Sequence, residues 1–230
     1  MNRRGWCAGL ALLGGCSNLS GPKGQPVSLE LSLPVPAVVE QNDTLRLRAR
    51  ALDINGDSVA ATIVWRSADT TLVVVDSAGL ITTALTSGTG RVQAVTGKLR
   101  STLSQLTIRP RSDTLTLTSP LADTVPATDS ASAALGSSVL SFNPAGGVLD
   151  NRVLYEVVDT VAALGTVRFA GGGLSQRVAT LSSGAVPATV SLRKVSGTTP
   201  PASVQVRVSA SRPSGTPVPG SGQIYTILFQ

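Results

Sequence analysis

The sequence of 230 residues contains no histidine, few aromatic residues and few charged ones. Without histidine, the chain lacks the usual general base of a Ser-His-Asp triad and the commonest ligand of zinc and iron sites. Aromatic residues make up only 3% of the sequence, which disfavours an aromatic-lined pocket and predicts a core of Val, Leu, Ile and Ala. The content of 42% hydrophobic and 14% charged residues disfavours a disordered chain or a coiled coil. We therefore expect a folded, non-catalytic protein with no cofactor and no metal site.

The N-terminus has the layout of a secretory signal. Asn2-Arg3-Arg4 gives a charged start, and the apolar segment from Gly5 to Leu13 is too short to span a bilayer. The residues Leu13-Gly14-Gly15-Cys16 resemble the lipobox of bacterial lipoproteins, in which small residues precede a cysteine that is acylated and becomes the new N-terminus. Residues 1–15 are therefore assigned to a signal peptide. The alternative is an ordinary signal peptide that is cleaved elsewhere, with Cys16 present by chance.

The lipobox resemblance implies that Cys16 carries several acyl chains, through which the membrane is a partner. Each buried CH2 group contributes about 0.8 kcal/mol, so two or more chains hold a protein stably in a leaflet. Cys7 would be removed with residues 1–15, which leaves one thiol and no disulfide within a mature chain. Residues 16–26 are rich in Gly, Ser and Pro and predict a flexible tether. Ser17 is compatible with passage to an outer membrane, so we expect a lipid-anchored protein of the cell envelope, on the periplasmic or surface face of that membrane.

The positive charge of the chain is diffuse. The net charge is +6 and the isoelectric point is near 10.1, yet no run of consecutive basic residues stands out. Loss of Arg3 and Arg4 with the signal peptide would leave 17 basic and 13 acidic side chains, a net charge of +4, which is typical of a soluble domain. Because few aromatic rings are present to stack on bases, no nucleic-acid partner is expected.

Residues 27–110 predict a two-sheet β-sandwich. Apolar and polar residues alternate there in short stretches separated by Gly, Asn, Asp and Pro, which is the period of half-buried strands. Between Thr44 and Ala51 the leucines and alanines share one face, while Arg46, Arg48 and Arg50 lie on the other. Further strands are predicted over 62–67, 72–75, 80–84, 90–96 and 101–108. About seven short strands at this spacing are typical of an immunoglobulin-type sandwich.

The same region resembles the bacterial Ig-like group 2 (BIG2) domain. The segments that carry the resemblance follow in order: Asn55-Gly56-Asp57, Ile63-Val64-Trp65-Arg66-Ser67, Val73-Val74-Val75-Asp76, Gly79-Leu80-Ile81-Thr82, Ser87-Gly88-Thr89 and Val92-Gln93-Ala94. The resemblance implies an Ig-like fold and a role in binding or display at a bacterial surface. Because the intersheet disulfide of antibody domains is absent, Trp65 is predicted to fill the core as a large apolar side chain that faces the opposite sheet.

Residues 111–230 predict a second, looser copy of the sandwich. Thr114–Thr118 predicts a first strand, and the residues that follow it up to Ser137 predict a long exposed connection. Beyond this connection the alternating segments include Ser203–Ala210 and a final strand at Ile224–Phe229. Tyr155 is expected to take the place that Trp65 has in the first copy. The stretch from Ser211 to Gly222, with three prolines, predicts an exposed hairpin loop or linker. The expected fold class is all-β, with two immunoglobulin-like β-sandwich domains in tandem after a signal peptide and a short spacer.

Two short motifs resemble functional sites but are better explained as structure. The segment Asp53–Asp57 has the alternate oxygen spacing of a calcium loop, but Gly56 comes two positions early and Val64 stands where a bidentate Glu is needed, so a hairpin turn is favoured. Ser191 and Lys194 fit the S-x-x-K pattern of penicillin-recognising enzymes. Their context alternates as a strand, which sends the two side chains to opposite faces, so no catalytic site is assigned.

Arg46, Arg48 and Arg50 form a candidate contact surface for phosphates, sulfates or acidic sugars. The favoured interpretation is a solvated sheet face that resists edge pairing, because no aromatic residue lies nearby to stack on a base or a sugar.

Three functions remain open. The leading one is a lipid-anchored cell-envelope protein whose Ig-like modules act in adhesion or as a structural spacer or scaffold, with an envelope protein as its ligand. The alternative is a carbohydrate-binding module for wall or exopolysaccharide, for which the chain has few aromatic residues to stack on sugars. The third is an uncommon hydrolase that depends on Ser191. The sequence does not define the oligomeric state.

Overall fold

The computed structural model describes residues 24–180 and 188–230. Within these two ranges the chain forms 22 strands and one helix of four residues, which confirms the predicted all-β fold class. The predicted signal peptide, Cys16 and the tether up to residue 23 lie outside the described residues. The described ranges contain no helix of the length and apolar character needed to cross a membrane.

The strands fall into two groups that share no strand pairing. The first group comprises β1 (Ser28–Ser32), β2 (Val38–Glu40), β3 (Thr44–Arg46), β4 (Arg48–Leu52), β5 (Ser58–Val59), β6 (Val64–Ser67), β7 (Val73–Val75), β8 (Leu80–Thr83), β9 (Gly88–Thr96), β10 (Leu99–Arg100) and β11 (Ser104–Arg109). The second comprises β12 (Thr114–Leu117), β13 (Ala122–Val125), β14 (Leu135–Phe142), β15 (Ala145–Gly147), β16 (Arg152–Val157), α1 (Thr160–Ala163), β17 (Val167–Phe169), β18 (Ser175–Ala179), β19 (Ala188–Val190), β20 (Leu192–Lys194), β21 (Ser203–Ala210) and β22 (Gln223–Phe229).

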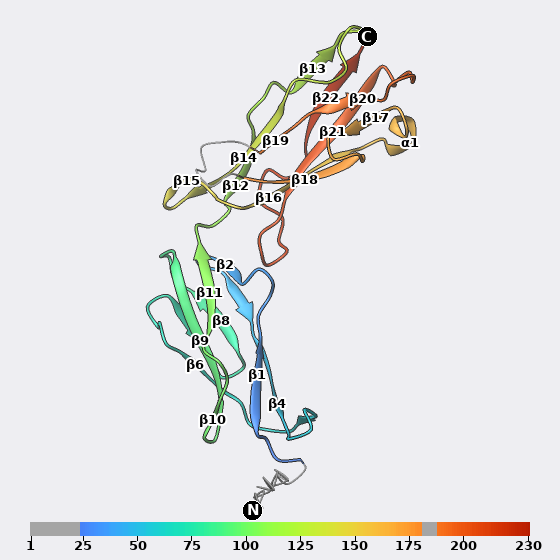
Figure 1. Ribbon diagram of the computed structural model, residues 1–230. Helices are drawn as coiled ribbons and strands as arrows, with labels where there is room; N and C mark the ends of the chain where they lie inside the picture. The colour runs from blue at the N-terminus through green and yellow to red at the C-terminus, as the bar shows by residue number, and fades with distance from the viewer. Residues whose placement is uncertain (1–23, 181–187) are drawn as a thin grey trace, which may run out of the picture.

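The first group forms a sandwich with the strand order of an immunoglobulin-like domain (Figure 1). In one layer β1 pairs with β4, β3 pairs with β8, and β8 pairs with β7. β3 and β4 continue one another on either side of Leu47, whose N–H donates to the Gly79 carbonyl at 2.8 Å. In the other layer β6, β9, β11 and β2 lie in that order, with β2 parallel to β11. The layers correspond to the ABED and CFG sheets of the Ig fold, with β2 added beside the last strand.

The core of the first sandwich lies between these layers. Leu47 and Ile81 from one layer pack against Val92, Leu106 and Ile108 from the other. Each of these side chains is almost fully buried and contributes about 1.5–3 kcal/mol relative to an exposed position. The alternation seen in the sequence therefore places the apolar side chains between the sheets, as expected for a sandwich.

The second group repeats the same arrangement. One layer has the order β13–β22–β21–β16–β18, and β13 lies parallel to the last strand, as β2 does in the first sandwich. In the other layer β12 and β19 both pair with β14, and β17 pairs with β20, which follows β19 in the chain. A single cluster of buried residues fills the space between the layers. The tandem of two Ig-like sandwiches is thus confirmed from strand order.

Some local features differ from the sequence-based expectations. The long exposed connection expected after Thr118, up to Ser137, contains β13, and the short strand β2 was not predicted. These strands have only three or four residues, which is too few to show a period of two in the sequence. Each forms by parallel pairing with a distant strand, which is about 70 residues away for β2 and about 100 residues away for β13. The loop from Ser211 to Gly222, expected to be exposed, has Val218 almost fully buried and sends Arg212 toward the first sandwich.

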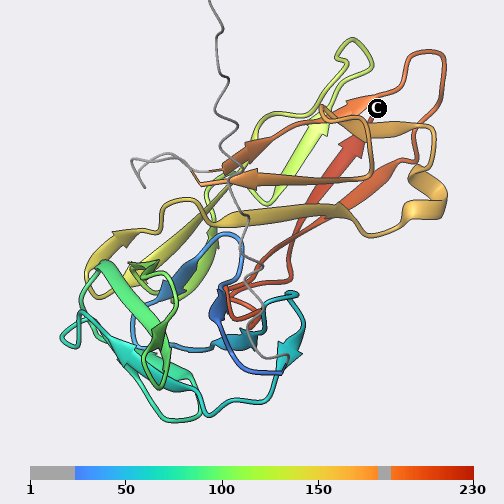
Figure 2. The ribbon, with the colours of Figure 1, turned by 60° about the horizontal axis from the view of Figure 1, so that its bottom comes forward.

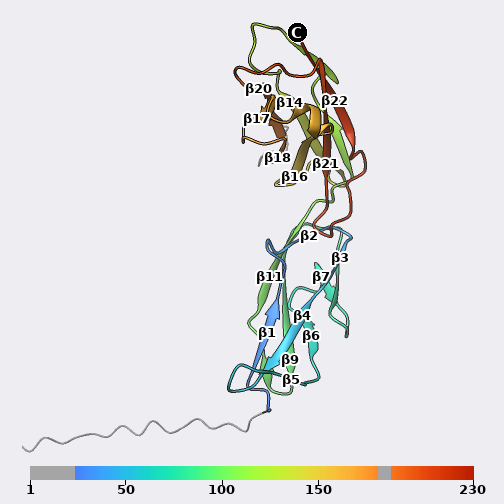
Figure 3. The same ribbon diagram turned by 90° about the vertical axis from the view of Figure 1, so that its right-hand side faces the viewer.

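The two sandwiches lie end to end (Figures 1 and 3). The first described residues and the C-terminus are at opposite ends of the molecule, and the chain crosses between the sandwiches at residues 110–113, after β11. The view in Figure 2 likewise shows the strands of each sandwich kept together as a separate body. The joint between them is therefore formed by loops and by the ends of strands.

Candidate functional site

The joint between the sandwiches is built around a buried carboxylate. Glu40, the last residue of β2, is 0% exposed. Its Oε1 accepts hydrogen bonds from Arg109 Nη2 at 3.0 Å and from Ser112 Oγ at 2.5 Å, and its Oε2 accepts one from the Ser112 N–H at 3.1 Å. Arg212 Nε lies 3.5 Å from Oε2. A buried carboxylate is costly unless it is paired and hydrogen-bonded, and these four contacts meet that requirement.

The partners of Glu40 come from both sandwiches. Arg109 belongs to β11, and its Nη1 donates across the joint to the carbonyls of Leu149 and Asp150 at 3.3 and 3.2 Å. Arg212 belongs to the loop between β21 and β22, and its Nε and Nη2 donate to the Ser112 carbonyl at 3.0 and 2.9 Å. Each guanidinium therefore contacts the carboxylate and a backbone carbonyl of the linker or of the second sandwich, which fixes the crossing segment from both sides.

Ser112 is the centre of this network within the linker. Its hydroxyl donates to Glu40 and accepts a hydrogen bond from Asn151 Nδ2 at 2.8 Å. The Asn151 N–H donates in turn to Thr180 Oγ1 at 2.9 Å, which ties the network to the loop after β18. Ser112, Asn151 and Thr180 are all at most 5% exposed, so this chain of hydrogen bonds is protected from competition by water.

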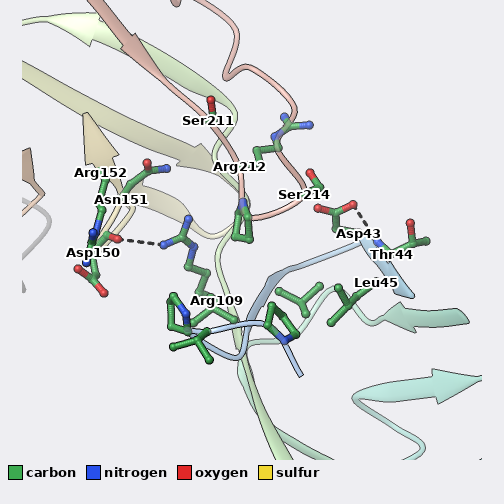
Figure 4. A pocket seen from close by; sticks show the side chains of 16 residues that line it. Asp43, Thr44, Leu45, Arg109, Asp150, Asn151, Arg152, Ser211, Arg212 and Ser214 are labelled. Carbon is green, nitrogen blue, oxygen red and sulfur yellow. Dashed lines mark hydrogen bonds between the residues drawn. The ribbon is translucent and has the colours of Figure 1, made fainter. Parts of the chain in front are cut away.

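An open groove of about 420 Å³ runs beside this network (Figure 4). Its walls come from the loop between β1 and β2, from the start of β3, and from two loops of the second sandwich. Pro34 and Pro36 supply apolar surface, while Asp43, Asp150 and the arginines of the joint supply charge of both signs. The lining residues in the described part of the chain include no aromatic side chain, so the chemistry of the groove favours charged or hydrogen-bonding ligands over stacked rings.

The three arginines predicted as a contact surface lie on β3 and β4 of the first sandwich. All three are exposed. Arg46 donates to the Ala78 carbonyl at 2.9 Å, and Arg50 forms an ion pair of 2.6 Å with Glu30 on the paired strand. Arg48 lies opposite Ser32. Two of the three are thus committed to neighbours within their own sheet.

The two aromatic residues predicted for the core have different surroundings. Tyr155 is fully buried in the second sandwich, donates to the Ala188 carbonyl at 2.6 Å and shares a hydrogen bond of 2.7 Å with Ser137. Burial raises the pKa of the Tyr155 hydroxyl above its usual value. Trp65 is only partly buried, and it packs against both apolar clusters of the first sandwich and over Gly79.

The motifs that resembled a calcium loop and a serine nucleophile form structural contacts. Asp53 Oδ1 accepts the N–H groups of Asn55 and Asp57 at 2.9 and 3.0 Å, which closes the turn between β4 and β5. Lys194 Nζ donates to the Pro126 carbonyl at 2.8 Å and lies 5.7 Å from the centre of the Phe229 ring, rather than beside Ser191. The described residues contain no group of three or more potential metal-binding His, Cys, Asp or Glu side chains.

The residues of the joint were not predicted from the sequence. These residues are Glu40, Arg109, Ser112, Asn151 and Arg212. The available signal was the pair of arginines that flank Pro110 at the expected boundary between residues 27–110 and 111–230. Charged side chains at a boundary indicate an interface only when an acid is known to lie opposite, and Glu40 is 69 residues from Arg109.

No family model and no curated protein matches this chain. Similar solved structures include the adhesin InvE of Yersinia pseudotuberculosis, at 19% identity over 91% of this chain and 61% of that chain, with a TM-score of 0.41. Domains 4 and 5 of the S-layer protein SbsC match at 16% identity over 89% and 98% of the two chains, with a TM-score of 0.34. The fibronectin(III)-like modules of Clostridium thermocellum CbhA match at 11% identity over 87% and 94%, with a TM-score of 0.41. The chain spans about 61% of the length of InvE, and similarity this weak assigns no function.

Proposed function

We propose that this chain is a lipid-anchored cell-envelope protein in which two Ig-like sandwiches form a non-catalytic spacer or scaffold that supports adhesion. The observation that carries this proposal is the joint. A spacer transmits position only if its modules keep their orientation, and flexible linkers between domains give no such control. Here a buried carboxylate joins β2 to the linker and to Arg212 of the second sandwich, which supports a fixed angle between the modules.

The proposed anchor precedes the first sandwich in the sequence. Acylation of Cys16 is supported by the lipobox resemblance of residues 13–16. The described chain starts at the end of the first sandwich that is remote from the joint (Figures 1 and 3). An anchor that precedes this end would hold the first sandwich near the bilayer and the second one farther out. The outer membrane, on its periplasmic or surface face, is the proposed location.

The absence of histidine from the sequence and the engagement of Lys194 with Pro126 support a non-catalytic role. The carbohydrate-binding alternative needs exposed aromatic rings that stack on neutral sugars, and the described aromatic residues give it little support. Tyr155 and Tyr225 are fully buried, and Phe142, which is 70% exposed, is not among the residues that line the groove.

The test of this function compares the full chain with its Cys16→Ser variant in a bacterial host that has an outer membrane. We expect mass spectrometry to find an acylated N-terminal cysteine in the parent, and fractionation to move the variant from the membrane to the soluble fraction. Crosslinking in intact envelopes would then identify a partner of the anchored form. An unacylated N-terminus, or turnover of esterase, peptidase or glycosidase substrates that Ser191→Ala abolishes, would contradict the proposal.

A further inference from the structure

A second, smaller hollow adjoins the groove at the joint. It has a volume of about 230 Å³ and lies against strands β18, β16 and β21 of the second sandwich. Arg152, Arg177 and Arg212 border it, together with Ser209 and Ser211. Three guanidinium groups and two serines therefore converge on one small space.

The strand register explains this convergence. Leu154 on β16 pairs with Arg177 on one side and with Ser209 on the other, so the three side chains form one row across the sheet. Arg152 lies two residues before Leu154 and shares its face, while the intervening Val153 points into the core. Leu154 is partly buried and supplies apolar surface to the lining of the hollow.

The charge of the hollow is not compensated from within, because no carboxylate is found among the described residues that line it. Arg152 and Arg177 are exposed, and no ion pair or side-chain hydrogen bond to either is found in residues 24–180 and 188–230. On the neighbouring row of the same sheet, by contrast, Arg207 is paired with Glu156 at 2.8 Å. The sheet thus neutralises one arginine and leaves two others beside the hollow.

We infer that this hollow binds the oxyanion of an acidic polysaccharide, with Arg152 and Arg177 as its main ligands. A guanidinium group binds a carboxylate, sulfate or phosphate through two parallel hydrogen bonds, and serine hydroxyls add further donors. The larger groove continues from the hollow, since Arg152, Ser211 and Arg212 line both. This continuity gives neighbouring units of a polymer a surface to follow.

Two observations favour a polysaccharide over other anionic macromolecules. Among the described residues no aromatic ring lines either cavity, and single-stranded nucleic acids are held largely by stacking on such rings. The strands that border the hollow also belong to the second sandwich, whereas the described chain begins at the end of the first sandwich that is remote from the joint (Figure 1). In one respect the inference rests on the proposed function: acylation of Cys16 would hold this end of the first sandwich near the membrane. The hollow in the second sandwich would then face away from the anchoring membrane.

The test measures binding to the full chain carrying Cys16→Ser, which removes the proposed anchor. The probes are an oligogalacturonate of defined length, its fully methyl-esterified form, dextran sulfate, inorganic phosphate and phosphatidylglycerol vesicles, each followed by titration calorimetry. We expect the charged oligosaccharide to bind and its neutral ester not to bind. The double variant Arg152→Gln/Arg177→Gln is expected to weaken this binding about tenfold or more, because it removes both bidentate partners.

The matched control is Arg66→Gln/Arg100→Gln, which removes the same charge from exposed positions on β6 and β10 of the first sandwich. We expect it to change the affinity by less than about twofold, since distant charges are screened by salt. Circular dichroism verifies that both variants fold. Equal weakening in both variants, equal binding of the ester, preference for phosphate or vesicles, or no binding of any acidic glycan would overturn the inference. None of these results bears on acylation of Cys16, which is measured separately.

Discussion

Replacement of Glu40 with alanine is expected to loosen the joint between the sandwiches. The variant removes the acceptor of three hydrogen bonds and the counter-charge of Arg109 and Arg212, whose side chains are 15% and 14% exposed. Removal of one partner from a buried ion pair typically costs about 3–5 kcal/mol. Both arginines keep their hydrogen bonds to backbone carbonyls in the variant. We therefore expect the free energy of unfolding to fall by about 3 kcal/mol, the lower end of this range.

The assay combines stability with geometry. Denaturation in urea is followed by the fluorescence of Trp65, which reports on the first sandwich, and by circular dichroism, which reports on both. A pair of spin labels on cysteines introduced at Lys98 and Asp129, both exposed, measures the distribution of distances between the two sandwiches. We expect Glu40→Ala to separate the two unfolding transitions and to broaden that distribution, because the modules are no longer coupled.

The matched control is Glu30→Ala, which breaks the exposed ion pair with Arg50. Exposed pairs contribute about 0–1 kcal/mol, so we expect little change in stability and none in the label distances. If Glu40→Ala retained the parental unfolding curve and an equally narrow distance distribution, the reasoning that a buried carboxylate fixes the joint would be refuted.

Three further predictions concern the cores. Trp65→Ala is expected to cost about 3 kcal/mol, because the partly buried indole joins both apolar clusters of its sandwich; an unchanged thermal midpoint would exclude that role. Gly90→Ala would place a Cβ 2.3 Å from a methyl group of the fully buried Val73, so we expect a loss of about 1–3 kcal/mol in urea denaturation, and an equally stable variant would show that the strand can shift. Burial raises the pKa of the Tyr155 hydroxyl. The contribution of this hydroxyl to the free energy of unfolding is therefore complete below about pH 10, and it is lost as the pH rises through the folded-state pKa. The stability gap between the parent and Tyr155→Phe is thus expected to narrow between about pH 7 and pH 11, and a constant gap in urea denaturation at these two values would contradict the assignment.

Much of the fold follows from local patterns in the sequence. The strand at Ser203–Ala210 alternates without interruption, and its observed bounds equal those expected from the pattern. The turn at Asp53–Asp57 was also predictable, because a carboxylate that accepts nearby N–H groups and a glycine at φ +84° are local requirements. Such features depend on residues a few positions apart, and a period of two is enough to reveal which side chains face the core.

The joint was decided by the tertiary structure alone. Glu40 is buried because β2 pairs with β11, which brings its carboxylate to a linker 72 residues later in the chain. Arg212 arrives from a loop 100 residues beyond Ser112, and the row of Arg177, Leu154 and Ser209 exists only through the register of three strands. Alternation determines which face of a strand is apolar, but it does not determine which strands become neighbours. The polar contacts of this protein depend on those neighbours, and therefore only the folded chain defines them.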